Sequence, residues 1–111
     1  MEYHEQLQTL TKKREELAQR YYDERTKYGQ MKSDIDVIYA SEIKAISDIK
    51  KNCGYETGLL LLIALKPALR DSYKAMVQGL NNYKALQRLI DSVESKIMAV
   101  QSIMRYNRSN D

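Results

Sequence analysis

Few residues of this chain have the types and spacing that catalysis or metal binding needs. A metal centre needs several His, Cys or carboxylate ligands close together, but His4 is the only histidine and Cys53 the only cysteine, far apart in the sequence. No histidine stands near a serine or near Cys53, so no nucleophile is paired with a base. Gly54 and Gly58 are followed by two leucines instead of the Lys and Ser or Thr of a phosphate-binding loop. These residues predict no enzyme activity, metal site, cofactor or small-molecule substrate.

Binding to nucleic acid is a second kind of chemistry that the residue types indicate. Single-stranded nucleic acid is held by basic side chains on the phosphates and by aromatic rings stacked on the bases. Cations and tyrosines alternate in residues 12–32 and again in residues 105–108. The candidate residues are Lys12, Lys13, Arg20, Tyr22, Arg25, Lys27, Arg105, Tyr106 and Arg108. The alternative is that neighbouring acids pair with these cations along the helix, and that Tyr21 and Tyr28 belong to a core.

The composition is that of a single helical domain. The 111 residues include 30% charged side chains, one proline and four glycines, and all nine aromatic residues are tyrosines. The formal net charge is +3. Residues 1–53 hold ten acidic and ten basic side chains, whereas residues 54–111 hold five acidic and eight basic ones. The second half therefore carries the whole positive excess, which is compatible with a polyanionic partner without requiring one.

The sequence also predicts a cytoplasmic location. The first residues are polar and acidic, unlike a secretory signal peptide. The longest apolar run, residues 59–65, is far shorter than the roughly 20 residues that span a bilayer. A single cysteine excludes an intramolecular disulfide and suits a reducing compartment. We expect no membrane partner, and we interpret Cys53 as a small apolar residue near a helix end.

A seven-residue repeat of apolar side chains predicts two helices that pair as a coiled coil. The repeat of the second half has no polar exception, and a companion set follows three residues later. The two sets are Leu69, Met76, Tyr83, Ile90, Ile97 and Met104, and Leu86, Val93 and Val100. In the first half, Arg14, Glu24 and Glu42 interrupt the repeat. Each of these charges either faces an opposite charge that sets the register or extends outward to solvent.

The break between the two helices predicts an antiparallel helical hairpin. We expect a helix at residues 3–51, a loop at residues 52–58 and a final helix at residues 67–107, followed by a flexible tail at 108–111. Gly54 suits a left-handed helix cap, and Thr57 suits the start of the next helix. Pro67 predicts either a kink or a short helix over residues 59–66, followed by a new helix at the proline.

The apolar run beside Pro67 predicts an interface. Its side chains cover every face of a helix, and a two-helix hairpin cannot bury them all. We expect a homo-oligomer in which this segment lies between subunits; the rival explanation is that it packs on its own first helix. The interface candidates are Leu59, Leu60, Leu61, Leu62, Ile63 and Leu65.

The layout resembles phage recombination-mediator proteins of the UvsY type. A first helix rich in Lys, Arg and Tyr, a short interruption, and a final helix with a local likeness in residues 92–106 carry the resemblance. It implies a helical, oligomeric, non-enzymatic protein that binds single-stranded DNA, helps to load a recombinase of the RecA type, and acts in a bacterial cytoplasm. This chain is shorter and less basic than that family, and no motif assigns a role to a particular residue.

Two functions follow as hypotheses. The first is a protein-interaction module, such as a chaperone, an inhibitor or an assembly adaptor, with an apolar groove that receives a partner helix. The alternative is an accessory protein that binds single-stranded nucleic acid, such as a phage recombination mediator. The partners expected are therefore a second copy of the chain and either another protein or a single strand.

Overall fold

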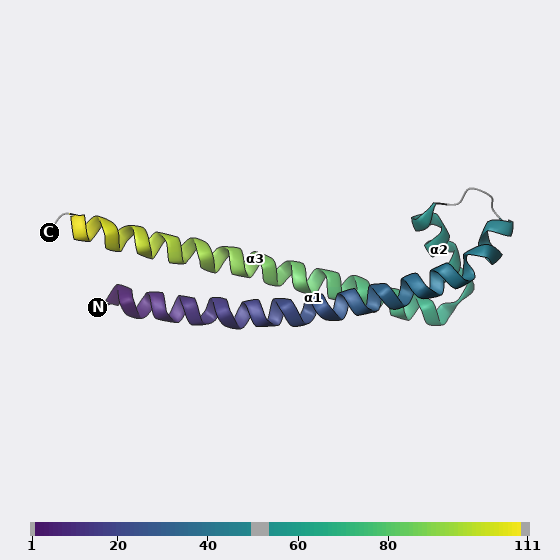
Figure 1. Cartoon of the computed structure of the whole chain (residues 1–111), viewed down its shortest axis with the longest axis horizontal. Coiled ribbons are helices and arrows are strands. Elements are labelled where there is room, and N and C mark those ends of the chain that lie inside the picture. The colour runs from purple at the N-terminus through teal and green to yellow at the C-terminus, as the bar shows by residue number, and fades with distance from the viewer. Residues whose placement is uncertain (1, 50–53, 110–111) are drawn as a thin grey trace. The chain divides into compact units, whose positions relative to one another are not determined.

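The structure, a computed structural model, describes residues 2–49 and 54–109, and side chains in residues 2–42 and 54–108. Three helices account for almost all of them: α1 at Glu2–Ile49, α2 at Tyr55–Leu65 and α3 at Pro67–Ser109. No strand occurs in the described residues. The fold is an all-α helical hairpin, which confirms the prediction, and Figure 1 shows the first half of α1 beside the last half of α3, running in opposite directions.

The start of α2 differs from the prediction. The loop was expected to extend to residue 58, but the helix begins at Tyr55. The reason is that the Gly58 N–H donates to the Gly54 carbonyl oxygen at 2.8 Å, which closes the first helical turn. Gly54 is extended, with φ −70° and ψ 166°, and not left-handed, and Thr57 lies inside the helix instead of capping it. Asn52 and Cys53 lie outside the described residues.

Pro67 separates two helices and does not kink one. Lys66 is extended, with φ −128° and ψ 93°, because the ring of a proline disfavours helical backbone in the preceding residue. Its N–H donates to the Leu62 carbonyl oxygen at 2.9 Å and ends α2, whereas its own carbonyl oxygen accepts from the Leu69 N–H at 3.0 Å. Pro67 then occupies the first helical position, where its missing donor costs nothing. At the other end, α3 includes Arg108 and Ser109, which were expected in a flexible tail.

The chain divides into two compact units. The first unit comprises Met1–Glu24 and Asn82–Asp111; the second comprises Arg25–Asn81. In the first unit, α1 and α3 bury the predicted heptad positions between them. Its core contains Leu17, Leu86, Ile90, Val93 and Ile97, with Leu7, Leu10 and Tyr21 packed against it. The rings of Tyr21 and Tyr83 meet edge to face, with centroids 5.8 Å apart.

The second unit buries a different kind of core, built from all three helices. Its buried residues are Ile35 of α1, Leu59 and Leu62 of α2, and Leu69 of α3. Half-buried aromatic and aliphatic side chains surround them: Tyr39, Leu61, Ile63, Tyr73 and Met76. Gly79 allows α1 and α3 to approach closely here, since a Cβ at this position would lie 2.8 Å from the Met31 Cε.

Candidate interaction site

The six apolar residues predicted as an interface do not share one surface. Leu59 and Leu62 are only 6% and 2% exposed and belong to the core of the second unit. Leu61 and Ile63 are half-buried against the same core. Leu60 and Leu65 point outward and are 61% and 62% exposed. Packing on the chain's own first helix thus accounts for Leu59 and Leu62, and the surface that remains for a partner contains Leu60 and Leu65.

A tyrosine attaches the first turn of α2 to α1. The Tyr55 hydroxyl donates a hydrogen bond to Asp36 Oδ1, and its ring lies 4.7 Å from the Tyr39 ring, centroid to centroid. The pKa of Tyr55 is raised from 10.0 to about 12, first by the hydrogen bond to Asp36 and second by burial. The protonated tyrosine is therefore the form that the folded protein stabilises.

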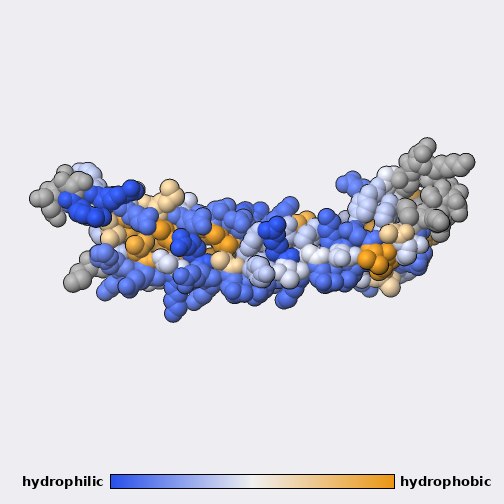
Figure 2. All heavy atoms as spheres, in the orientation of Figure 1, coloured by the Kyte–Doolittle hydropathy of each residue, from blue (hydrophilic) through white to orange (hydrophobic). Residues whose placement is uncertain are grey.

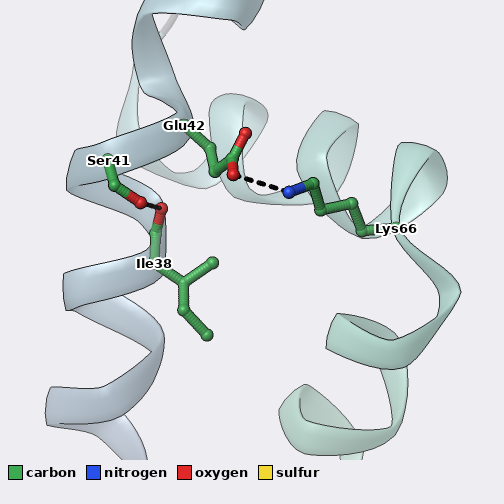
Figure 3. Close-up of polar contacts among 4 residues, drawn as sticks. All are labelled: Ile38, Ser41, Glu42 and Lys66. Atoms are coloured by element: carbon green, nitrogen blue, oxygen red, sulfur yellow. Dashed lines mark hydrogen bonds and ion pairs between the residues drawn. The ribbon is translucent and has the colours of Figure 1, made fainter.

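An ion pair attaches the other end of α2. Lys66 Nζ lies 2.6 Å from Glu42 Oε1 (Figure 3), with both side chains partly open to water. The hydroxyl of the preceding residue, Ser41, donates to the Ile38 carbonyl oxygen at 2.8 Å. Glu42 was one of the charges that interrupt the heptad repeat of the first helix, and here it does face an opposite charge. α2 is thus held at its ends by polar contacts and in its middle by two leucines.

A groove opens where the three helices of the second unit meet. Its volume is about 390 Å³. Leu60 is one of the residues that line the groove, and its side chain is also exposed to solvent. Three tyrosines, two leucines and a methionine make most of its wall, and one cation and one anion complete it. We call it the tyrosine groove; it is lined by Tyr28, Lys32, Tyr55, Glu56, Leu59, Leu60, Tyr73 and Met76. Rings with a polar tip, next to aliphatic side chains and a few charges, are the composition of protein-binding surfaces.

The predicted nucleic-acid residues of α1 do not form a single surface. In the first unit, Lys13 and Arg20 are seven residues apart and share a face of the helix. Tyr22 is 67% exposed, but it lies about 180° around the helix from Lys13. In the second unit, Arg25 and Lys27 are two residues apart and lie about 200° from each other. Cations and rings that alternate along the sequence therefore lie on different faces of α1. Lys12, the remaining candidate on this helix, does not bring the cations and Tyr22 onto one face.

The C-terminal candidates are brought closer together. Arg105 and Arg108 line one groove of about 410 Å³ with Leu7, Gln101 and Met104, all within the first unit. Arg105 Nη2 also lies 3.5 Å from the Ser102 hydroxyl, to which it donates. Tyr106 is 69% exposed and lies outside that groove. Two cations thus converge, and one ring stands on an adjacent face.

Sequence reasoning missed most of the tyrosine groove. Tyr28 and Met76 were interpreted as heptad core, and Lys32, Glu56 and Tyr73 were not singled out. The only local signals are the spacings: Tyr28 and Lys32 are four residues apart, and Tyr73 and Met76 are three apart, so each pair shares a helical face. That these faces meet beside the first turns of α2 depends on the tertiary structure.

No protein-family model, curated protein or solved structure matches the chain. Among the described residues, no cluster of three or more metal-ligating side chains occurs, and no helix has the length and apolar character to cross a membrane. The class defined by the fold is an all-α helical hairpin.

Proposed function

We propose that this protein is a non-enzymatic protein-interaction module that binds a large apolar side chain of a partner protein in the tyrosine groove. The observation that carries the proposal is the groove itself, with Leu60 exposed at its edge. A chaperone, an inhibitor or an assembly adaptor would use such a site in the same way, to hold one short segment of its partner.

The chemistry of the groove supports a peptide segment as its ligand. Covering an exposed leucine such as Leu60 contributes about 1.5–3 kcal/mol, and tyrosines lose little conformational entropy when a ligand packs against them. Lys32 and Glu56 lie on different helices and carry opposite charges. They favour a partner segment in which an apolar residue stands between an acidic and a basic one, because charges at a rim set orientation.

Selection from a displayed library of random peptides on the intact protein tests this proposal. The enriched peptides are expected to share a large apolar residue with flanking charges. Leu60→Lys and Tyr73→Ala are expected to weaken their binding at least about tenfold, because groove residues of this kind dominate binding energy. Val37→Lys is the matched control, since Val37 is 67% exposed and lies about 180° around α1 from Tyr28. Equal binding of the same peptides to wild type and to Leu60→Lys would contradict the proposal.

Binding to single-stranded nucleic acid is the second candidate function, and the convergence of Arg105 and Arg108 in one groove favours it. Two cations can hold adjacent phosphates while Tyr106 stacks on a base. Fluorescence anisotropy with a labelled single strand tests this function. Affinity is expected to fall steeply as salt rises, and Arg105→Ala with Arg108→Ala is expected to flatten that dependence. Affinity that does not respond to salt would exclude this candidate.

A further inference from the structure

Half of the residues that line the tyrosine groove come from the first six residues of α2. Tyr55, Glu56, Leu59 and Leu60 form this α2 wall, and the other lining residues belong to α1 and α3. The α2 wall can hold a ligand only if the first turns of the helix keep a fixed position. The contacts that fix them therefore matter for binding, even where they lie outside the groove.

The start of α2 has little support of its own. Gly54 precedes the helix and has no side chain that could accept hydrogen bonds from the first free N–H groups. Gly58 lies within the helix, where a glycine loses more conformational entropy than an alanine. The hydrogen bond from the Gly58 N–H to the Gly54 carbonyl oxygen closes the first turn. Because an uncapped helix start opens readily, contacts from another helix must hold this turn.

Two residues of α1 supply such contacts, and both act on Tyr55. The Tyr55 hydroxyl donates to Asp36 Oδ1, and its ring packs on the Tyr39 ring with the two planes tilted by 58°. Tyr55 is 45% exposed, so burial alone does not restrict its rotamer. A hydrogen bond to a carboxylate is directional and stronger than one between neutral groups. Asp36 therefore sets the direction in which the Tyr55 side chain points.

The groove and these two contacts share one face of α1. Steps of four residues lead from Tyr28 to Lys32 and on to Asp36, and each step turns only about 40° around the helix. Tyr39 lies about 20° from Tyr28. Tyr28 and Lys32 line the groove, whereas Asp36 and Tyr39 do not. Asp36 thus continues the α1 wall one turn beyond the groove, where it holds Tyr55 without occupying the ligand's place.

Apolar packing holds the middle of α2. Leu59 and Leu62 are buried in the core of the second unit. In the part of the molecule that contains α2, Figure 2 shows a small group of apolar side chains with hydrophilic ones around it. Such packing has no preferred direction, so it keeps α2 on its neighbours without fixing the rotation of its first turn. The hydrogen bond to Asp36 adds that direction.

The ion pair of Lys66 with Glu42 holds the opposite end of α2. Lys66 follows the last helical residue, Leu65, which lies ten residues after Tyr55 and about 15 Å along the helix. No residue of this end lines the tyrosine groove. The two polar contacts of α2 are thus similar in kind, since each joins it to a carboxylate of α1, but only the contact of Asp36 lies beside the site.

We propose that Asp36 is the positioning residue of the tyrosine groove: it holds Tyr55, and through it the first turn of α2, in the arrangement that a ligand needs. The proposal rests on the proposed function for the identity of the ligand, whereas the control of the first turn can be measured without one. Affinity for a peptide then depends on an α1 residue that the peptide does not touch. Glu42, by contrast, affects the far end of α2 alone.

Hydrogen exchange at single amides of the ligand-free protein tests the control of the first turn. Asp36→Ala is expected to speed exchange of the Gly58 N–H by about threefold to tenfold, because the turn opens more often. Glu42→Ala is the matched control, since it also removes a carboxylate that holds α2. It is expected to speed exchange of the Lys66 N–H and to change that of the Gly58 N–H by less than about twofold. Unchanged exchange at Gly58 in Asp36→Ala, or equal acceleration in both variants, would overturn the proposal.

Titration of the selected peptides tests the consequence for binding. Asp36→Ala is expected to weaken binding by about threefold to tenfold, and Glu42→Ala by less than about twofold. Asp36→Asn is expected to restore most of the affinity, because its amide oxygen still accepts from the Tyr55 hydroxyl. Tyr55→Phe removes the donor. Combined with Asp36→Ala, it is expected to cost no more than either substitution alone, since both remove the same hydrogen bond.

Three results would count against these expectations. Asp36→Asn as weak as Asp36→Ala, or single losses that multiply in the combined variant, would overturn the role of Asp36. If wild type enriched no peptide, the proposed function would fail, and exchange of the Gly58 N–H would still decide whether Asp36 holds the first turn. Circular dichroism shows whether each variant keeps its helices.

Discussion

The two compact units bury apolar side chains by different means. The first unit pairs two helices along a heptad seam, and its core residues follow one another at regular spacings on α3. The second unit combines three helices, and among the described residues its core has tyrosines, a methionine and two further aliphatic side chains around four buried aliphatic residues. Regular pairing leaves both flanks of the seam exposed, whereas three converging helices leave a groove between them. The groove of the proposed function therefore belongs to the second unit alone.

The largest expected effect concerns the core of the second unit. Leu62 is 2% exposed and packs on Ile35 and Leu69, so Leu62→Ala is expected to lower the free energy of unfolding by about 2–5 kcal/mol. Leu60→Ala on the same helix is the matched control and is expected to change it by less than about 0.5 kcal/mol. Urea denaturation followed by circular dichroism measures both. Equal losses would mean that α2 does not pack as described and that the second unit has no core of its own.

The contrast between Leu60 and Leu62 also shows which part of the fold could not be predicted from the sequence. The α3 seam was predictable, since Leu86, Ile90, Val93 and Ile97 are all buried as their spacing requires. Pro67 predicted either a kink in one helix or a break between two helices. The break occurs because the proline ring disfavours helical backbone in the preceding residue, Lys66. The buried face of α2 was not predictable, because apolar residues at every position from 59 to 63 carry no periodicity.

The tyrosine groove could not be predicted from the sequence for a different reason. Its walls come from three helices, and none of them has a local pattern that points to the others. The hydrogen bond from Tyr55 to Asp36 joins residues 19 positions apart, and the pair of Lys66 with Glu42 joins residues 24 apart. Periodicity reports which face of a helix is buried, but it does not report which faces meet.

A glycine pair tests how closely the helices of the second unit approach. Gly29 has open space where a Cβ would stand, whereas a Cβ on Gly79 would meet Met31 Cε at 2.8 Å. Gly29→Ala is expected to raise the free energy of unfolding by about 0.5–1 kcal/mol, the usual gain within a helix. Gly79→Ala is expected to gain less, because the Met31 side chain must move. Urea denaturation of both variants measures the difference, and an equal gain would show that the approach at Gly79 is looser than described.

The hydrogen bond of Tyr55 predicts a dependence on pH at the alkaline end. The folded protein raises the pKa of this phenol from 10.0 to about 12, so the folded state binds the proton more tightly than the unfolded state does. The contribution to stability is therefore complete below pH 10 and is lost as the pH rises toward 12. Tyr55→Phe is expected to remove this part of the pH dependence and to leave the contact with the Tyr39 ring in place.

Denaturation of wild type and Tyr55→Phe at a series of alkaline pH values measures the effect of the phenol. The other tyrosines titrate in both proteins, so the difference between the two curves isolates Tyr55. Tyr73→Phe is the control for loss of a hydroxyl in the same groove. A difference that does not change with pH would mean that Asp36 does not hold the Tyr55 proton in the folded state.

The ion pair of Lys66 with Glu42 is expected to have the smallest effect, and its size bears on how α2 is held. The nitrogen and oxygen lie 2.6 Å apart, but the side chains are 47% and 35% exposed, so water and salt screen their attraction. A double-mutant cycle with Lys66→Ala and Glu42→Ala is expected to give a coupling of about 0.2–1 kcal/mol that declines as salt is added. A coupling well above that range, or one that salt does not reduce, would show that the pair is shielded from water. The second unit would then hold α2 by its charged end as firmly as by Leu59 and Leu62, and its contrast with the apolar seam of the first unit would rest on electrostatics as well as on packing.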